Sequence, residues 1–154
     1  MPDNKFETQE QIIARWLKRA RESQLSHHLM AEKLKHRNYI LGITTITVTT
    51  ITGATTLTTS LSELFKLFFG LASLTAAFLA GLQTFLKLDE RANNHKAAAA
   101  SYGSVRRLLE LASATNESNA LDQLNVAKVE LDKLAKESPS VSKKTLDEAL
   151  KRTS

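Results

Sequence analysis

Residues 67–86 read LFFGLASLTAAFLAGLQTFL, and this stretch decides the fold. It contains no ionisable side chain, and its only polar residues are Ser73, Thr75, Gln83 and Thr84. As a helix it would extend about 30 Å at about 1.5 Å per residue, which matches the roughly 30 Å hydrocarbon core of a bilayer. The stretch therefore predicts a helix that spans a membrane.

A second window without charge precedes it, from residue 38 to residue 62, with Tyr39 as its only ionisable side chain. Within it, residues 40–60 read ILGITTITVTTITGATTLTTS and carry ten Thr, so their hydropathy is borderline for a membrane span. Alone, the window could form a buried strand pair or an amphipathic helix. A membrane helix is favoured by the absence of Pro, by small residues such as Gly42 and Gly53, and by the strong span that follows. Helical periodicity also favours it, because most of the Thr fall on one face.

Basic residues flank the two windows on their outer sides. They are Lys18, Arg19, Arg21, Lys33, Lys35 and Arg37 before the first window, and Lys87, Arg91, Lys96, Arg106 and Arg107 after the second. The connection, residues 60–66, holds one Lys and places Ser60 and Glu63 at capping-box spacing for a new helix. The positive-inside rule then puts both termini in the cytoplasm and the connection outside.

The sequence thus predicts an all-α fold built on a two-span transmembrane helical hairpin with cytosolic N- and C-terminal helical arms. We expect a cytosolic amphipathic helix in residues 1–37 and the hairpin in residues 38–88, with spans at about 39–59 and 67–87. Residues 89–154 should form cytosolic helices.

The arms have their own helix signals. Thr8 and Gln11 form a plausible capping box for a helix that can run straight into the first span. Trp16 is too far from Tyr39 to share an interfacial belt with it, so we expect Trp16 to pack against another arm. The carboxyl-terminal arm predicts helices over residues 89–111, 119–137 and 142–152.

Composition excludes several classes of function. The chain has no Cys, which removes disulfides, thiolate metal sites and cysteine nucleophiles. The four His include no pair at the i, i+4 spacing of a helical metal site, so solvated or structural roles are favoured. No phosphate-binding glycine loop and no nucleophile elbow is present, so we expect neither an enzyme nor a resident metal or cofactor. The net charge of +5 suits nucleic acid or anionic lipid without choosing between them.

The Thr stripe of the first window has two interpretations. The hydroxyls can bond to the carbonyl four residues earlier and line a helix contact. Alternatively, they face a pore enclosed by several subunits in a ring, because a monomeric hairpin cannot enclose one. The pore-lining candidates under this second interpretation are Thr45, Thr49, Thr52, Thr56 and Thr59.

The densest polar cluster outside the spans is residues 101–110, SYGSVRRLLE. Arg106 and Glu110 can form an ordinary i, i+4 surface pair. Alternatively, a basic collar beneath the membrane contacts lipid phosphate, nucleic acid or an acidic partner. The candidates for contact with a partner or trigger are Trp16, Arg19, His95, Lys96, Tyr102, Arg106 and Arg107.

In the order of its segments, the chain resembles the SLATT domains (SMODS and SLOG-associating two-transmembrane effector domains). The resemblance covers roughly residues 10 to 112. It rests on WLKRARESQ at 16–24, LGI at 41–43, GLQTFL at 81–86, ERA at 90–92, His95-Lys96, ASYG at 100–103 and Arg106-Arg107.

The resemblance implies a homo-oligomeric effector of a prokaryotic anti-phage, abortive-infection system that permeabilises the bacterial inner membrane when an associated partner is triggered. The implied partners are a nucleotidyltransferase that makes second messengers, a nucleotide-sensing domain or a reverse transcriptase. Two other interpretations stay open. One is a soluble or conditionally soluble helical oligomer that binds and regulates a partner enzyme or nucleic acid, and the other is a holin-like protein that forms lesions without a trigger.

Overall fold

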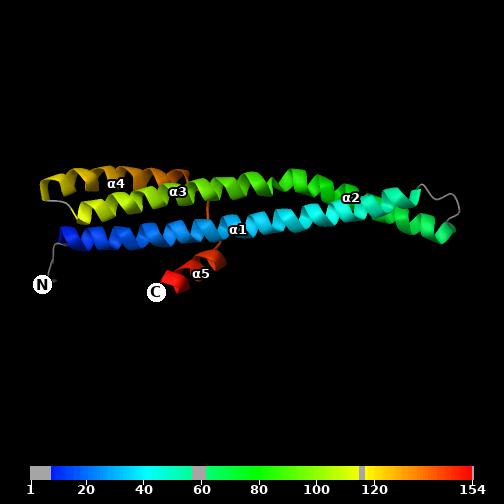
Figure 1. Ribbon diagram of the computed structural model, residues 1–154, viewed down its shortest axis with the longest axis horizontal. Coiled ribbons are helices and arrows are strands. Elements are labelled where there is room, and N and C mark those ends of the chain that lie inside the picture. Colours follow the sequence, from blue (N-terminus) through cyan, green and yellow to red (C-terminus); the bar gives the residue numbers. More distant parts are fainter. Residues whose placement is uncertain (1–7, 57–61, 115–116, 154) are drawn as a thin grey trace, which may run out of the picture. The chain divides into compact units, whose positions relative to one another are not determined.

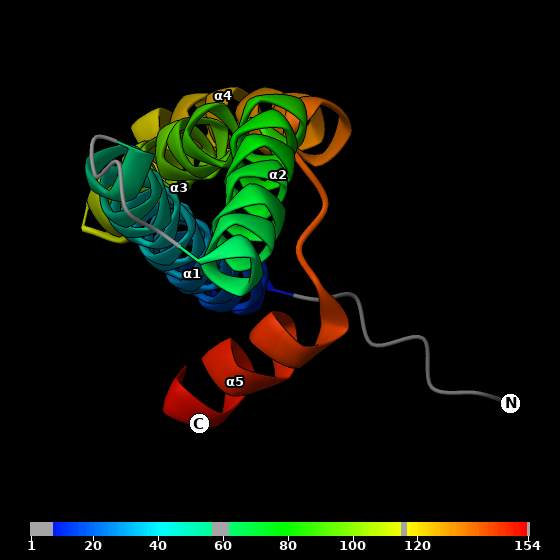
Figure 2. The same ribbon diagram turned by 90° about the vertical axis from the view of Figure 1, so that its right-hand side faces the viewer.

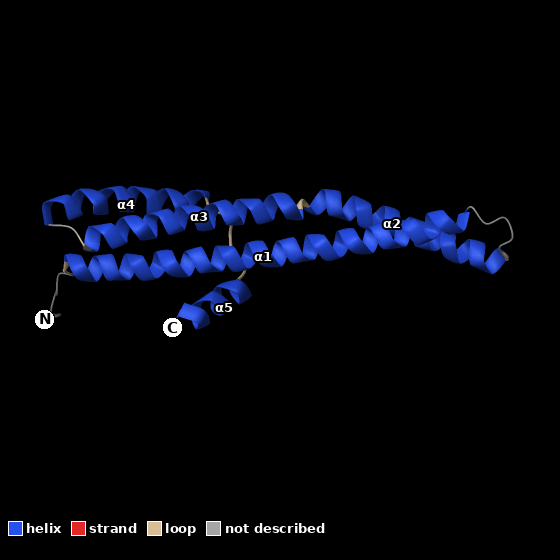
Figure 3. Cartoon of the chain, viewed as in Figure 1, coloured by secondary structure: helices blue, strands red, loops and turns tan. Residues whose placement is uncertain are grey.

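The computed structural model describes residues 8–56, 62–114 and 117–153, and all of its regular structure is helical. The helices are α1 (Gln9–Thr56), α2 (Glu63–Leu86), α3 (Leu88–Ser113), α4 (Glu117–Glu137) and α5 (Lys143–Thr153). No strand occurs in these three stretches (Figure 3). The all-α prediction is confirmed, and the strand-pair alternative for the first uncharged window is wrong over the part that the structure describes.

The chain divides into two compact units, and each is described by itself. The first, here called the bundle, contains the described residues up to Ala31 and from Asn93 onward. The second, here called the hairpin unit, contains Glu32–Ala92. Helices α1 and α3 therefore contribute to both units. The hairpin unit begins six residues before and ends four residues after the limits of 38 and 88 expected from charge, so it includes charged residues of both arms.

Helix α1 begins with the capping box that its sequence predicts. The Thr8 backbone N–H donates to Gln11 Oε1 at 3.0 Å, and the Gln11 N–H donates to Thr8 Oγ1 at 3.3 Å. These two bonds satisfy donors that the first turn of a helix leaves free. From there α1 continues without interruption to Thr56, which confirms that the amino-terminal arm runs directly into the Thr-rich window.

Helix α2 begins later than its predicted cap. Its N-cap is Ser62, with extended dihedral angles (φ −66°, ψ 157°) and no side-chain cap bond. Glu63 is then the first helical residue and cannot occupy the third position of a capping box with Ser60, so that prediction is wrong. Ser60 itself lies outside the described residues.

A single left-handed residue, Lys87, separates α2 from α3. Its dihedral angles are φ 46° and ψ 43°, a conformation that costs a non-glycine residue about 1–2 kcal/mol. Helical hydrogen bonding resumes at once, since the Arg91 N–H donates to the Lys87 carbonyl at 3.0 Å. The break therefore falls at the first charged residue after the uncharged stretch.

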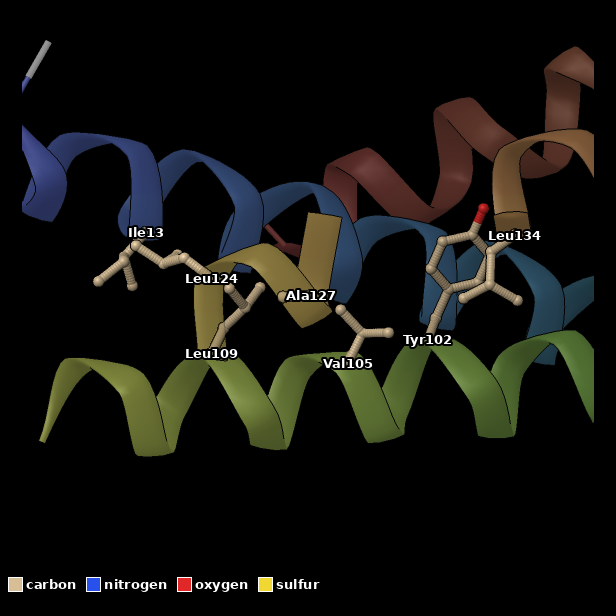
Figure 4. Packing of buried hydrophobic residues seen from close by; sticks show 7 residues of the cluster. All are labelled: Ile13, Tyr102, Val105, Leu109, Leu124, Ala127 and Leu134. Atoms are coloured by element: carbon tan, nitrogen blue, oxygen red, sulfur yellow. The ribbon is translucent and has the colours of Figure 1, made fainter. Parts of the chain in front are cut away.

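The core of the bundle lies among α1, α3 and α4. Its buried cluster consists of Ile13, Tyr102, Val105, Leu109, Leu124, Ala127 and Leu134, and Trp16, Leu17, Leu108 and Leu131 pack against it (Figure 4). Each helix presents these residues at helical spacing, so burying one face of each helix forms the core. The expectation that Trp16 packs against other helices is confirmed.

Helix α5 packs on the opposite side of α1 from α4 (Figure 1, Figure 2). Its first turn is closed by Ser142, whose carbonyl accepts from the backbone N–H groups of Thr145 and Leu146 at 2.9 and 3.0 Å. Thr145 is buried, and its hydroxyl lies 3.9 Å from the sulfur of Met30 on α1. The predicted short helix capped by Ser142 is confirmed.

The hairpin unit pairs α1 with α2 in antiparallel orientation. The buried or half-buried positions include Leu34, Asn38, Leu41, Thr45, Val48 and Thr52 on α1, and Phe69, Ala72, Ala76, Leu79, Gln83 and Leu86 on α2. Their alternating spacing of three and four is that of two helices packed along one seam. Gly42 faces Gln83 across this contact, where an added Cβ would lie 3.4 Å from Gln83 Nε2.

We expect Leu109→Ala to lower the free energy of unfolding by about 2–5 kcal/mol, because Leu109 is fully buried and its truncation leaves a cavity. Denaturant titration of the detergent-solubilised chain, followed by Trp16 fluorescence, measures this loss. Leu111→Ala on the same helix is the matched control, because Leu111 is 61% exposed. Equal effects of the two substitutions would contradict the packing described for α3.

Candidate functional site

The first candidate surface is the outer face of α2. Eight large apolar side chains on this helix are 55–83% exposed: Leu64, Phe65, Leu67, Phe68, Leu71, Leu74, Phe78 and Phe85. Exposed apolar patches of this extent mark contact with a membrane or a partner in natural proteins. Among the described residues, one helical run is long and apolar enough to cross a membrane; it begins at Glu63, and 6% of its apolar window is buried.

The Thr-rich part of α1 does not pass the same criterion over its described residues, which end at Thr56. Several of its hydroxyls nevertheless donate hydrogen bonds within the helix. Thr45 donates to the Leu41 carbonyl and Thr50 to the Ile46 carbonyl, each at 2.8 Å, and Thr49 and Thr52 donate to the carbonyls of Thr45 and Val48. A hydroxyl bonded in this way needs no water.

The five predicted pore-lining residues do not share one environment. Thr45 is half-buried and Thr52 is buried, both at positions of the seam with α2. Thr49 is exposed at the edge of that seam. The structure describes neither the side chain of Thr56 nor residue Thr59. For Thr45 and Thr52 the geometry therefore favours the helix-contact interpretation. Of the candidates whose side chains the structure describes, Thr49 is the one that could still face a pore.

The second candidate site is a buried histidine pair in the bundle, which the sequence did not reveal. His27 on α1 and His95 on α3 place their Nδ1 atoms 2.9 Å apart, and their exposed fractions are 4% and 2%. Tyr102 stacks on the His27 ring with a centroid distance of 5.5 Å and an interplanar angle of 21°. In the neutral pair one Nδ1 donates and the other accepts, so the pair joins α1 to α3.

Burial, together with repulsion by His95 and His28, lowers the pKa of His27 from 6.5 to about 4. The charged form is disfavoured because the ring has lost its contact with water. His27 is therefore neutral at physiological pH. The hydrogen bond between the two Nδ1 atoms requires at least one neutral ring, because a protonated imidazole has no acceptor nitrogen.

A polar chain of contacts continues from this pair along the same two helices. Gln24 on α1 accepts a hydrogen bond from Arg106 Nη1 at 3.2 Å, and Arg106 Nε lies 3.2 Å from Glu110 Oε1. The end of Gln24 reaches α3 at Gly103, where a Cβ would lie 2.8 Å from Gln24 Nε2. Gly103 thus makes room for Gln24, a role that the sequence analysis did not give it.

The predicted basic collar does not assemble as one surface. His95 is turned into the contact between α1 and α3, whereas Lys96 is exposed. Arg106 is held by Gln24 and Glu110, and Arg107 Nη2 donates to Ser104 Oγ at 3.0 Å. The ordinary i, i+4 pair of Arg106 and Glu110 is confirmed. The burial of His95 explains why these residues do not form one patch.

Three other predicted contact residues do converge. Trp16 and Arg19 on α1 and Tyr102 on α3 line one cavity of about 160 Å³, which α4 closes with Lys128, Leu131, Asp132 and Ala135. The sequence named all three as contact candidates, but it could not indicate that α4 completes the cavity. In the described stretches, no group of three or more His, Asp or Glu residues could hold a metal ion.

Comparisons of the chain with protein-family models, curated proteins and solved structures find no match.

The buried His27 predicts a loss of stability in mild acid. The unfolded chain takes up the proton near pH 6.5 and the folded chain only near pH 4, so stability is complete above pH 6.5 and falls as the pH drops below it. We expect a decrease of at most about 3 kcal/mol at pH 4. Denaturant titrations between pH 7 and 5 measure its onset, and NMR titration of the imidazole protons gives the pKa directly.

His28→Gln serves as the control for this prediction, because His28 is exposed and contributes least to the lowered pKa of His27, so its removal should reduce the acid-induced decrease only slightly. A His27 ring that titrates near pH 6.5 in the folded chain would contradict the buried neutral pair.

Proposed function

We propose that the chain is an integral membrane protein whose hairpin unit inserts into the bilayer, with the bundle and both termini in the cytoplasm. The observation that carries this proposal is the uncharged, largely uncovered face of α2. Full transfer of one large apolar side chain out of water is worth about 1.5–3 kcal/mol, so its eight exposed side chains favour lipid by roughly 10 kcal/mol.

The Thr-rich part of α1 would be the second span. Its backbone groups are bonded within the helix, and the described hydroxyl bonds to carbonyls four residues earlier lower the cost of placing Thr in lipid. Gly42 allows close approach of Gln83, so the amide of α2 lies against the partner helix. These features support a two-span hairpin, and the basic residues on its outer sides support cytoplasmic termini.

Arginine substitution at matched exposed leucines tests insertion. Leu74 and Leu111 are 70% and 61% exposed, but Leu74 lies near the middle of α2 and Leu111 lies in the bundle. An Arg at the centre of a span costs about 2.5–3.5 kcal/mol. We therefore expect Leu74→Arg to reduce the carbonate-resistant membrane fraction by tenfold or more and Leu111→Arg to leave it unchanged.

If both variants fractionate like the wild type, α2 does not cross lipid. The soluble or conditionally soluble oligomer that binds a partner would then replace the membrane proposal.

We further propose that the chain oligomerises and permeabilises the inner membrane as an effector of an anti-phage system. The resemblance of its ordered segments to SLATT domains supports this role. The trigger would be an associated nucleotidyltransferase, reverse transcriptase or other partner that acts on the bundle. In this scheme Thr49 contributes a hydroxyl to the path for ions, because it is exposed beside the seam and not enclosed by α2.

A pair of threonine variants tests the path. We expect Thr49→Leu to abolish dye-reported depolarisation of cells that express the chain with its triggering partner, while chemical cross-linking still detects oligomers. Thr47→Leu is the control, because Thr47 is also exposed but lies about 160° away from Thr49 around the helix, at 100° per residue. Depolarisation that persists in Thr49→Leu would exclude Thr49 from the path.

A further inference from the structure

The cavity in the bundle is built from matched faces of two helices. Helix α1 contributes Trp16, Arg19 and Ser23, spaced by three and four residues. Helix α4 contributes Lys128, Leu131, Asp132 and Ala135 at the same helical spacing, and Tyr102 of α3 completes the lining. Side chains from three helices therefore surround one volume.

Donors outnumber acceptors among the polar groups of this lining. Within the described part of the chain, the Arg19 guanidinium, the Trp16 indole N–H and the Tyr102 hydroxyl have no hydrogen-bond or ion-pair partner. The one carboxylate, Asp132, is already engaged, because its Oδ2 lies 3.1 Å from Lys128 Nζ. Arg19 and Lys128 are positively charged and Asp132 is negatively charged, so the lining carries one net positive charge at neutral pH.

We propose that this cavity binds a phosphate group, either as inorganic phosphate or as a phosphate monoester. A tetrahedral oxyanion presents acceptors in several directions at once, which suits donors that come from different helices. The planar guanidinium of Arg19 can donate two parallel hydrogen bonds to it. The inference stands on the bundle alone and does not depend on membrane insertion.

The size of the cavity limits the ligand. The cavity's volume is about 160 Å³. Pockets for drug-sized ligands have about 300–1,000 Å³. The site therefore accepts a phosphate group with a small substituent and excludes larger ligands from full enclosure. The indole of Trp16 and the side chain of Leu131 supply the apolar wall for that substituent.

The single Trp of the chain reports on the site, because it lines the cavity. The experiment titrates the full-length chain, solubilised in a non-ionic detergent, with sodium phosphate at constant ionic strength and follows Trp16 fluorescence. We expect a saturable change in wild type and in Arg21→Gln, and a Kd about tenfold higher in Arg19→Gln, since a charged hydrogen bond is worth about 1.5–3 kcal/mol. Arg21 is exposed on the same helix and does not line the cavity.

A second pair of variants tests the same cavity from α4. Lys128→Gln should also weaken binding, and Lys133→Gln, an exposed lysine outside the lining, should not. Helical circular dichroism shows whether each variant is folded. If Arg19→Gln does not fold, the Lys128 pair still decides the question.

Parallel titrations with glycerol 3-phosphate and sodium acetate define the ligand. Tighter binding of glycerol 3-phosphate than of phosphate would support the proposal and identify a monoester such as a lipid headgroup, and the reverse order would support free phosphate. The proposal is overturned if phosphate gives no saturable change, if Arg19→Gln and Lys128→Gln bind like their controls, or if acetate binds as tightly as phosphate.

Discussion

The apolar surface of α2 is the constraint on which the rest of the molecule depends. One side of this helix meets α1, where Ala76 is buried at 2% exposure, but the other side carries a row of exposed Leu and Phe. A hairpin of two helices has no third element to cover that row. The chain must therefore either place it in lipid or cover it with other molecules. The charge pattern follows the same boundary, since the uncharged stretch and α2 both end at Leu86, directly before Lys87.

This constraint also explains how α1 can be rich in Thr. A helix beside α2 in lipid would have no water for its side chains, and in α1 the described hydroxyl bonds run back to the helix's own carbonyls. The same pattern recurs on α2, where Thr75 and Thr84 donate to the carbonyls of Leu71 and Ala80 at 2.9 and 3.1 Å. A Thr-rich helix can therefore present a less polar surface than its composition suggests, because hydroxyls that donate to backbone carbonyls are already hydrogen-bonded.

Local signals in the sequence predicted most of the helices but little of the bundle's polar interior. The Thr8 capping box, the Ser142 cap and the helical spacing of apolar residues act over three or four positions, and the structure contains all of them. The Ser60 prediction failed for the same local reason, since a second serine two positions later, Ser62, is the N-cap. The pair of His27 and His95 joins residues 68 positions apart, and no local pattern carries that information. The cavity at Trp16 likewise could not be predicted from the sequence, because α4 supplies half of its lining residues.

One regularity of α1 was available in the sequence and extends through both units. The buried or half-buried positions Ile13, Ala20, His27, Leu34, Leu41 and Val48 recur every seven residues, and Leu17, Gln24, Ala31, Asn38, Thr45 and Thr52 recur with the same period. A seven-residue repeat keeps these positions close to one face of the helix, since an ideal α-helix drifts by only about 20° per heptad.

His27 and Gln24 lie in that seam with polar contacts to α3, as single polar residues do when they fix the register of packed helices. Within the bundle, these two contacts therefore fix which face of α1 meets α3, and Thr45 and Thr52 lie in the separate contact of α1 with α2 within the hairpin unit.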